Sequence, residues 1–202
     1  MAGVEALLAA YMVAFAFVHS YTASRGFKKK IEARMEPQVY RFYYTVFSVV
    51  TTLPIVWIWL YYGKGAPVVY SVPFPFRWIS FVLMLLGAGL ALVSLLQTDP
   101  LAFIGVKAVL RLDSGGDKGL NKSGTYSLVR HPLYLGGMLL LWGNPVMTTV
   151  ALTGSTFATA YFIVGGRLEE QKLIEEFGDE YREYMKEVSG FIPIKWIKNR
   201  IG

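Results

Sequence analysis

Four long stretches of apolar residues dominate this chain of 202 residues. They run from about Ala2 to His19, from Phe42 to Tyr62, from Trp78 to Leu96 and from Leu133 to Gly166. An α-helix rises ~1.5 Å per residue, so about 20 apolar residues cross the hydrocarbon layer of a bilayer. Charged residues make up only 17% of the chain, against about 25% in an average soluble domain. The sequence therefore predicts an all-α, polytopic integral membrane protein.

The fourth stretch is too long for a single membrane span. Its 34 residues carry no charge. As one helix they would be about 50 Å long, well beyond the thickness of a bilayer. Asn144-Pro145 and Thr153-Gly154-Ser155 both offer a break. We expect a tight helical hairpin with its turn between residues 144 and 155, which brings the number of transmembrane helices to about five.

The distribution of basic residues orients these spans. Of the 20 lysines and arginines, 18 fall in residues 24–41, 98–131 and 166–202. Five spans place these three segments on one side, which the positive-inside rule makes the cytoplasmic side of the inner or cell membrane. The N-terminus is then outside and the C-terminus cytoplasmic. Because the basic residues flank apolar runs, the net charge of +6 does not imply nucleic-acid binding.

We expect a single domain, residues 1–202, with four parts. Three spans (1–97) precede a long cytoplasmic loop (98–131), the hairpin (132–166) and a C-terminal segment (167–202). The loop contains a turn-forming run from Asp113 to Asp117. In the C-terminal segment, apolar and aromatic residues recur at helical spacing, which predicts an amphipathic helix over 167–189 on the cytoplasmic face, interrupted by Gly178 and ended by Gly190 and Pro193.

Composition excludes several kinds of chemistry. The chain has no cysteine, so it has no thiolate nucleophile, no disulfide and no cysteine ligands for zinc or iron–sulfur clusters. It has only two histidines, which excludes a histidine-rich metal site. It also lacks a glycine-rich dinucleotide motif and a Walker lysine motif. We predict no metal centre.

The densest group of reactive side chains lies where the long loop enters the hairpin. Arg130 can bind a carboxylate through two parallel hydrogen bonds. His131 can donate or accept a hydrogen bond near neutral pH. A positively charged helix entrance anchored at the lipid headgroups would explain the same residues.

A second charged group, Arg167, Glu169 and Glu170, directly follows the last span. As the start of a helix, the two glutamates would complement the helix dipole, which is an alternative explanation for them. Both groups lie at the cytoplasmic ends of the hairpin arms, so we expect them to be neighbours in space. Together they could hold a zwitterion, with its carboxylate on Arg130 and its ammonium on a glutamate.

The run Arg130-His131-Pro132-Leu133-Tyr134 resembles the R-H-P-x-Y motif of the isoprenylcysteine carboxyl methyltransferase and phospholipid methyltransferase superfamily. Glu169-Glu170 follows about 35 residues later, as in that superfamily. A narrower resemblance is to the branch that includes methanethiol S-methyltransferases and denitrification-associated membrane proteins. The residues that carry it are His19-Ser20, Ala23-Ser24, Tyr40-Arg41, Asp99-Pro100-Leu101, Phe103, Gly105 and the segment from Trp142 to Thr148.

This resemblance implies methyl transfer from S-adenosyl-L-methionine to a small membrane-soluble acceptor. It places the cofactor in a pocket formed by the loop, the hairpin entrance and the C-terminal helix. The implied cofactor-binding residues are Leu120, Asn121, Tyr126, Arg130, His131, Pro132, Leu133, Tyr134, Glu169 and Glu170. Three positions depart from the superfamily: Lys118 replaces a histidine, Asn121 replaces a valine, and Gly165 stands where prenylcysteine enzymes carry a substrate-facing arginine. We therefore favour a thiol acceptor over an isoprenylcysteine carboxylate or a lipid amine.

Methyl transfer from a sulfonium depends mainly on the positioning of donor and acceptor. A thiol acceptor must ionise, so we expect His131 or Arg167 to have a catalytic role. Two alternatives are an NADPH-dependent membrane reductase of the sterol-reductase type and a non-catalytic membrane protein that keeps the fold. The partners implied are the lipid bilayer and the small acceptor; no soluble partner and no nucleic acid is implied.

Overall fold

The computed structural model describes residues 3–104, 106–110 and 119–201 of the chain. The structure is 76% helical. It divides into two compact units, which are described separately. Unit 1 comprises residues 1–70, 99–116 and 147–157, and unit 2 comprises residues 71–98, 117–146 and 158–202.

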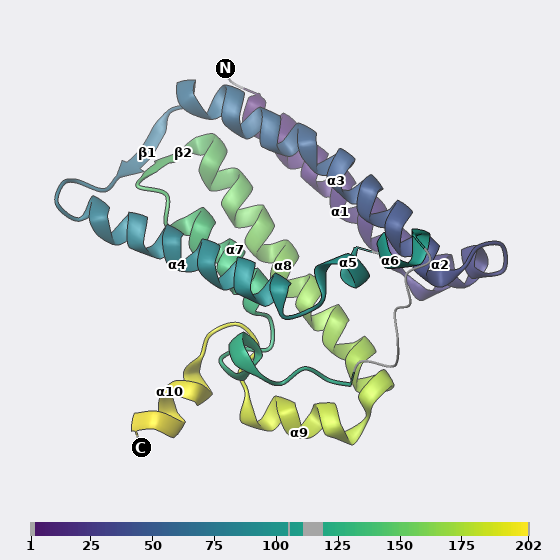
Figure 1. Cartoon of the computed structure of the whole chain (residues 1–202). Coiled ribbons are helices and arrows are strands. Elements are labelled where there is room, and N and C mark those ends of the chain that lie inside the picture. The colour runs from purple at the N-terminus through teal and green to yellow at the C-terminus, as the bar shows by residue number, and fades with distance from the viewer. Residues whose placement is uncertain (1–2, 105, 111–118, 202) are drawn as a thin grey trace. The chain divides into compact units, whose positions relative to one another are not determined.

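The elements follow one another as shown in Figure 1. The first half of the chain contains α1 (Val4–Ala23), α2 (Arg25–Glu32), α3 (Pro37–Tyr62), the 3-10 helix η1 (Gly63–Gly65), β1 (Val68–Ser71), α4 (Arg77–Leu96), α5 (Pro100–Phe103) and α6 (Val106–Val109). The second half contains η2 (Gly124–Ser127), α7 (Pro132–Trp142), β2 (Val146–Thr148), α8 (Thr149–Phe177), α9 (Asp179–Glu187) and α10 (Ile194–Ile201). The strands β1 and β2 pair with each other, and the sequence did not predict them.

Four of the described helices are long and apolar enough to cross a membrane. They are α1, α3, α4 and α8. A fifth apolar helix, α7, has 11 residues. The predicted helical membrane protein is thus supported, while the count of five spans and their orientation stay predictions.

The long uncharged stretch breaks once. The helix α7 ends at Trp142 and α8 begins at Thr149, so the break contains Asn144-Pro145. The other expected break, Thr153-Gly154-Ser155, lies inside α8. Gly154 has a packing role there, because a Cβ on it would lie 3.0 Å from the ring of Trp59.

The C-terminal segment differs from the single amphipathic helix predicted over 167–189. The helix α8 continues past the apolar stretch to Phe177, and α9 follows after Gly178. Gly178 has a φ of +59°, a backbone conformation that favours glycine, and it separates the two helices. A further helix, α10, lies beyond the predicted region. The predicted turn from Asp113 to Asp117 lies outside the described residues.

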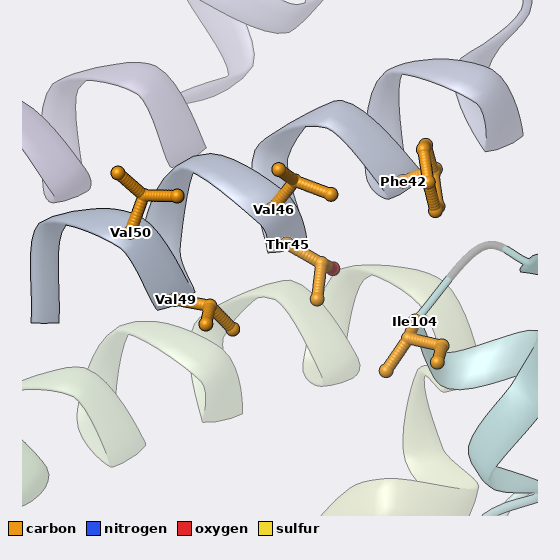
Figure 2. Close-up of a pocket in the computed structure, with 6 residues that line it drawn as sticks. All are labelled: Phe42, Thr45, Val46, Val49, Val50 and Ile104. Carbon is orange, nitrogen blue, oxygen red and sulfur yellow. The ribbon is translucent and has the colours of Figure 1, made fainter. Parts of the chain in front are cut away.

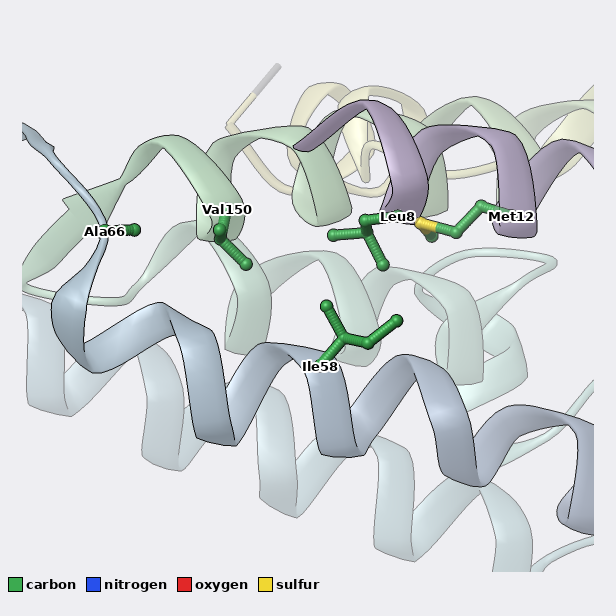
Figure 3. Close-up of a cluster of buried hydrophobic side chains, with 5 residues drawn as sticks. All are labelled: Leu8, Met12, Ile58, Ala66 and Val150. Atoms are coloured by element: carbon green, nitrogen blue, oxygen red, sulfur yellow. The ribbon is translucent and has the colours of Figure 1, made fainter. Parts of the chain in front are cut away.

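Unit 1 is held together by an apolar cluster and by hydrogen bonds between α1 and α3. Figure 3 shows the buried cluster, which consists of Leu8, Met12, Ile58, Ala66 and Val150. Further along the same helices, His19 lies 2.8 Å from Ser48 Oγ through Nε2 and 2.8 Å from the Tyr44 hydroxyl through Nδ1. Neutral hydrogen bonds of this kind commonly link membrane helices.

An apolar groove lies on α3 in unit 1 (Figure 2). It is lined by Phe42, Thr45, Val46, Val49, Val50 and Ile104. Its lining carries one hydroxyl and no ionisable group, so it suits an apolar chain better than a reacting group.

Unit 2 is organised around α7. This helix lies beside α4 (Figure 1), and the two cross at Gly87 and Gly136. A Cβ on either glycine would lie 2.7 Å from the backbone oxygen of the other, so only glycine allows this close approach. On another side, Trp142 Nε1 of α7 donates a hydrogen bond of 2.8 Å to Thr159 Oγ1 of α8. This packing aligns the start of α7 with the charged end of α8.

Candidate functional site

The start of α7 is fixed by the chain near the C-terminus. Pro132 occupies the first turn of the helix, where its missing N–H leaves no unsatisfied donor. The residue Val129 pairs with Ser189 in a parallel bridge. The backbone N–H groups of Arg130 and His131 donate to the carbonyls of Ser189 and Gly190, at 2.9 and 3.0 Å. This short strand-like pairing presents the Arg130 and His131 side chains to α8.

Glu170 of α8 is the centre of the site. Its Oε1 accepts hydrogen bonds from Arg130 Nε at 2.9 Å and Arg130 Nη2 at 2.6 Å. The same oxygen lies 3.0 Å from His131 Nε2. The three side chains are only 13%, 10% and 4% exposed for Glu170, Arg130 and His131. They therefore form a buried, hydrogen-bonded ion pair with the histidine as a third member.

The third guanidinium nitrogen of Arg130 also forms hydrogen bonds within the protein. This nitrogen, Nη1, donates to the carbonyls of Val188 and Met185. All three guanidinium nitrogens therefore bind groups of the chain itself. The sequence suggested that Arg130 binds the carboxylate of a zwitterionic ligand. In the structure Arg130 instead binds the carboxylate of Glu170.

Glu169 has a different environment from its neighbour. Its side chain is 50% exposed, and its Oε2 accepts a hydrogen bond of 3.2 Å from the Tyr134 hydroxyl. The same oxygen lies 3.8 Å from His131 Nδ1. Adjacent residues on a helix point in different directions, which explains why one glutamate is enclosed and the other is open.

Four stacked rings run through the site. Their order is Phe191, His131, Tyr134 and Phe162, with centroid separations of 5.0, 5.5 and 5.2 Å. Both faces of the His131 ring are thus covered, and its two nitrogens lie at the edge of the stack facing the two glutamates.

Two glycines make room for this stack. A Cβ on Gly166 would lie 2.6 Å from Phe191 Cζ and 3.3 Å from the His131 ring. A Cβ on Gly137 would lie 3.0 Å from the Phe162 ring. The sequence analysis did not identify Phe162 and Phe191 as part of the site. The only indication of these close contacts in the sequence was the presence of glycines among bulky apolar residues.

Two buried tyrosines of α9 lie close enough to Arg130 to interact with its charge. Tyr181 is 1% exposed and Tyr184 is 4% exposed. Burial, reinforced by the charge of Glu170, raises the pKa of Tyr181 to about 12. Burial also raises the pKa of Tyr184, whose hydroxyl donates a hydrogen bond of 2.6 Å to the Tyr126 carbonyl. Both phenols therefore stay neutral near pH 7, so neither supplies a base.

The loop before α7 is tied to the end of α4. The side chain of Asn121 donates to the Gln97 carbonyl at 3.2 Å. Gln97 Oε1 in turn accepts from the Thr125 N–H and hydroxyl at 3.1 and 2.6 Å. Gly124 adopts a φ of +59°, and a Cβ on it would lie 1.9 Å from the Gln97 amide nitrogen. Leu120, one residue before Asn121, is half-buried.

The structure brings together five of the predicted side chains: Arg130, His131, Tyr134, Glu169 and Glu170. Pro132 is buried and Leu133 half-buried at the same helix start. Arg167 is exposed and forms no ion pair or hydrogen bond with any residue that the structure describes. Lys118 lies outside the described residues. Across the described part of the chain, no group of three acidic or histidine side chains is placed to hold a metal ion.

Comparison with known proteins identifies the family of this chain. The sequence profile of the NnrU protein family matches residues 7–164. The chain belongs to the NnrU protein family. It is 32% identical over 185 residues to a methanethiol S-methyltransferase of Pseudomonas deceptionensis, covering 89% of this chain and 69% of that relative. It is 30% identical over 184 residues to a methanethiol S-methyltransferase of Mycobacterium tuberculosis, covering 89% of this chain and 74% of that relative.

A second, more distant relationship is confined to part of the chain. The human protein-S-isoprenylcysteine O-methyltransferase is 39% identical over 80 residues, which is 38% of this chain and 28% of the human protein. No solved structure matches. The superfamily and the branch predicted from the motifs are both confirmed. The names of the relatives, with the four apolar helices, support an integral membrane methyltransferase.

Proposed function

We propose that the protein transfers a methyl group from S-adenosyl-L-methionine to a small, membrane-soluble thiol. The observation that carries this proposal is the pairing of an enclosed carboxylate, Glu170, with an open one, Glu169, on either side of His131. The thiol is favoured because the relatives matched over most of the chain are named for methanethiol.

The site fits the amino-acid part of such a cofactor. S-adenosyl-L-methionine carries an ammonium group, a carboxylate and a positively charged sulfonium. Glu169 is half exposed, and no cation among the described residues lies at hydrogen-bond distance from it, so we assign it the ammonium group. Glu170 holds Arg130 and His131 in place and is a positioning residue. Leu120 and Asn121 would lie on the adenosine side. The pocket would be lined by Tyr126, Pro132, Leu133 and Tyr134.

The reaction would be an in-line displacement. The thiolate sulfur forms a bond to the methyl carbon while the bond from carbon to the sulfonium breaks, and the leaving thioether is neutral. No acid is needed, because the leaving group is neutral. The protein's contribution is to hold the acceptor sulfur about 3–3.5 Å from the methyl carbon, in line with the bond from that carbon to the sulfonium.

We assign His131 the role of taking the proton of the thiol. A carboxylate only accepts hydrogen bonds, so His131 Nε2 donates its hydrogen to Glu170. In the neutral ring the lone pair is then on Nδ1, on the side of Glu169. We assign Nδ1 as the proton acceptor. Arg167, exposed on α8, would act only through its charge.

Gly165 also supports a thiol acceptor over a carboxylate. No described side chain lies within 4 Å of the position that a Cβ on Gly165 would take. A glycine at this position supplies no cation to bind an acceptor carboxylate. We further propose that the site faces the cytoplasm, following the distribution of basic residues.

An acceptor assay tests the proposal. Purified protein in vesicles would receive S-adenosyl-L-methionine with a labelled methyl group and, separately, methanethiol, a farnesylcysteine analogue or phosphatidylethanolamine. We expect labelled dimethyl sulfide from methanethiol and little transfer to the other two. Label on the farnesylcysteine carboxylate or the lipid amine, with none on the thiol, would overturn the assignment of the acceptor.

A further inference from the structure

The C-terminal strap, residues 189–201, joins the site to a surface that the reaction does not use. At its start, Ser189 and Gly190 pair with the backbone of Arg130 and His131. The next residue, Phe191, stacks on the His131 ring at 5.0 Å. The strap then continues into α10. Whatever holds α10 therefore also acts on the position of Phe191.

One side of the strap is apolar and open. Ile192, Ile194 and Ile197 are 63%, 50% and 42% exposed. Ile194 and Ile197 are three residues apart on α10 and so share one face. Exposed isoleucines grouped in this way mark a surface that meets another apolar phase.

Basic residues flank the apolar face of α10, because Lys198 lies one turn after Ile194 and Arg200 lies three residues after Ile197. Lys198 and Arg200 are exposed, and the Arg200 guanidinium lies 4.9 Å from the centre of the Trp196 ring. The sequence from Val188 to Gly202 contains no acidic residue. A short helix with apolar, aromatic and basic residues is typical of segments that lie in the interface of a bilayer with anionic lipids.

Lys195 has a separate, structural role. Its Nζ donates hydrogen bonds of 2.8 Å to the carbonyls of Met185 and Lys186 at the end of α9. Its backbone N–H donates to Ser189 Oγ at 3.1 Å. These contacts connect α10 to the body of unit 2 and leave Lys198 and Arg200 to meet an outside partner.

We infer that α10 docks on the surface of an anionic bilayer and thereby strengthens cofactor binding. The isoleucines would enter the acyl boundary, and Lys198 and Arg200 would meet lipid phosphates. The bilayer is the expected occupant, because unit 2 itself contains α4, a helix long and apolar enough to cross it, and because the charges are complementary. Docking would keep Phe191 against His131. The effect on the cofactor rests on the proposed function; the docking does not.

The absence of cysteine allows a direct test of docking. A single cysteine in place of Ile197 carries a polarity-sensitive fluorophore, with Asn199→Cys on the polar side as the matched control. Both proteins are reconstituted in phosphatidylcholine and in phosphatidylcholine mixed with phosphatidylglycerol. We expect a blue shift at position 197 only in the anionic vesicles, and loss of that shift in Lys198→Gln/Arg200→Gln. Each cation should contribute roughly fivefold to the docking equilibrium at low salt.

Other outcomes of this experiment would overturn the docking. Identical emission from position 197 in both lipids would show that anionic lipid does not recruit α10. A label shielded in both lipids, together with crosslinks between copies, would show that a second copy of the chain covers this face.

The affinity for S-adenosylhomocysteine in the same vesicles tests the coupling. We expect binding several-fold tighter in the anionic vesicles, with no such difference in Lys198→Gln/Arg200→Gln. Phe191→Leu should remove the lipid dependence while the fluorophore at position 197 still shifts. A shift with equal affinities in both lipids would overturn the coupling alone. Absence of S-adenosylhomocysteine binding in either lipid would instead overturn the proposed function.

Discussion

Units 1 and 2 place different polar groups between their helices. In unit 1, His19 links α1 to Ser48 and Tyr44 of α3 through hydrogen bonds with hydroxyl groups. In unit 2, the polar contact between α8 and the start of α7 is a buried ion pair, Arg130 with Glu170. Hydrogen bonds between membrane helices contribute on average about 0.6 kcal/mol. A buried ion pair often contributes no net stability, because removing two charges from water offsets their attraction.

This difference separates packing from function. Hydroxyl groups suffice to link His19 of α1 to α3 in unit 1. The Arg130–Glu170 ion pair of unit 2, in contrast, is not explained by a contribution to stability. They hold His131 at a fixed orientation beside an open carboxylate, Glu169. The comparison therefore predicts that substitutions in the ion pair and its surroundings affect binding and catalysis, and that substitutions in the His19 network affect stability alone.

The largest effect should come from Glu170→Ala. Removing one partner of a buried pair leaves an uncompensated charge, which typically costs about 3–5 kcal/mol of unfolding free energy. Thermal unfolding in detergent would measure the loss. Glu169→Ala is the matched control on the adjacent, half-exposed carboxylate and should leave stability nearly unchanged. Similar small losses of unfolding free energy in both variants would show that the two glutamates do not differ in their contribution to stability.

Glu169→Gln should affect binding and spare stability. A hydrogen bond to a charged group contributes roughly 1.5–3 kcal/mol, so the affinity for S-adenosylhomocysteine should fall about 10- to 150-fold. Calorimetric titration measures this change. Unaltered affinity would show that Glu169 is only a solvated residue of α8, since it lies twenty residues after the start of this helix.

Gly166→Ala should disturb the ring stack. Its Cβ would meet Phe191 and His131, and overpacking of this kind costs about 1–3 kcal/mol. We expect weaker cofactor binding, because His131 must move. Gly165→Ala is the control, since open space surrounds that position. Equal behaviour of the two alanine variants would argue against the stack as a determinant of the site.

The smallest effect should come from Ser48→Ala in unit 1. This substitution removes one neutral hydrogen bond between helices. The expected loss of unfolding free energy is about 0.6 kcal/mol and at most about 1.7 kcal/mol. The melting temperature should fall slightly, and the affinity for S-adenosylhomocysteine should not change. A large loss of affinity with normal stability would give the His19 network a functional role and break the comparison between the units.

Much of the fold could be predicted, because membrane spans depend on uncharged length. The boundaries of α1, α3 and α4 lie within a few residues of the apolar stretches. The proximity of Arg130 to the glutamates also followed from the break in the fourth stretch. Thr153–Ser155 was a wrong candidate for that break, because Gly154 makes room for Trp59 inside a continuous helix.

The rest depended on contacts that sequence spacing does not encode. Which glutamate is enclosed follows from the rotation of α8 relative to the start of α7. The position of Phe191 follows from a backbone pairing between residues 129–131 and 189–190, about 60 residues apart. Helix α10 is short and polar on one side, so its pattern was too weak to predict.

Calorimetric titration of the purified protein with S-adenosylhomocysteine, and separately with NADPH, tests the central claim most directly. The account predicts saturable binding of S-adenosylhomocysteine, weakened by Glu169→Gln, and no binding of NADPH. Binding of NADPH alone would identify a reductase, and binding of neither ligand by folded protein would identify a non-catalytic member of the family. Either result would contradict a methyl-donor site between Arg130-His131 and Glu169-Glu170.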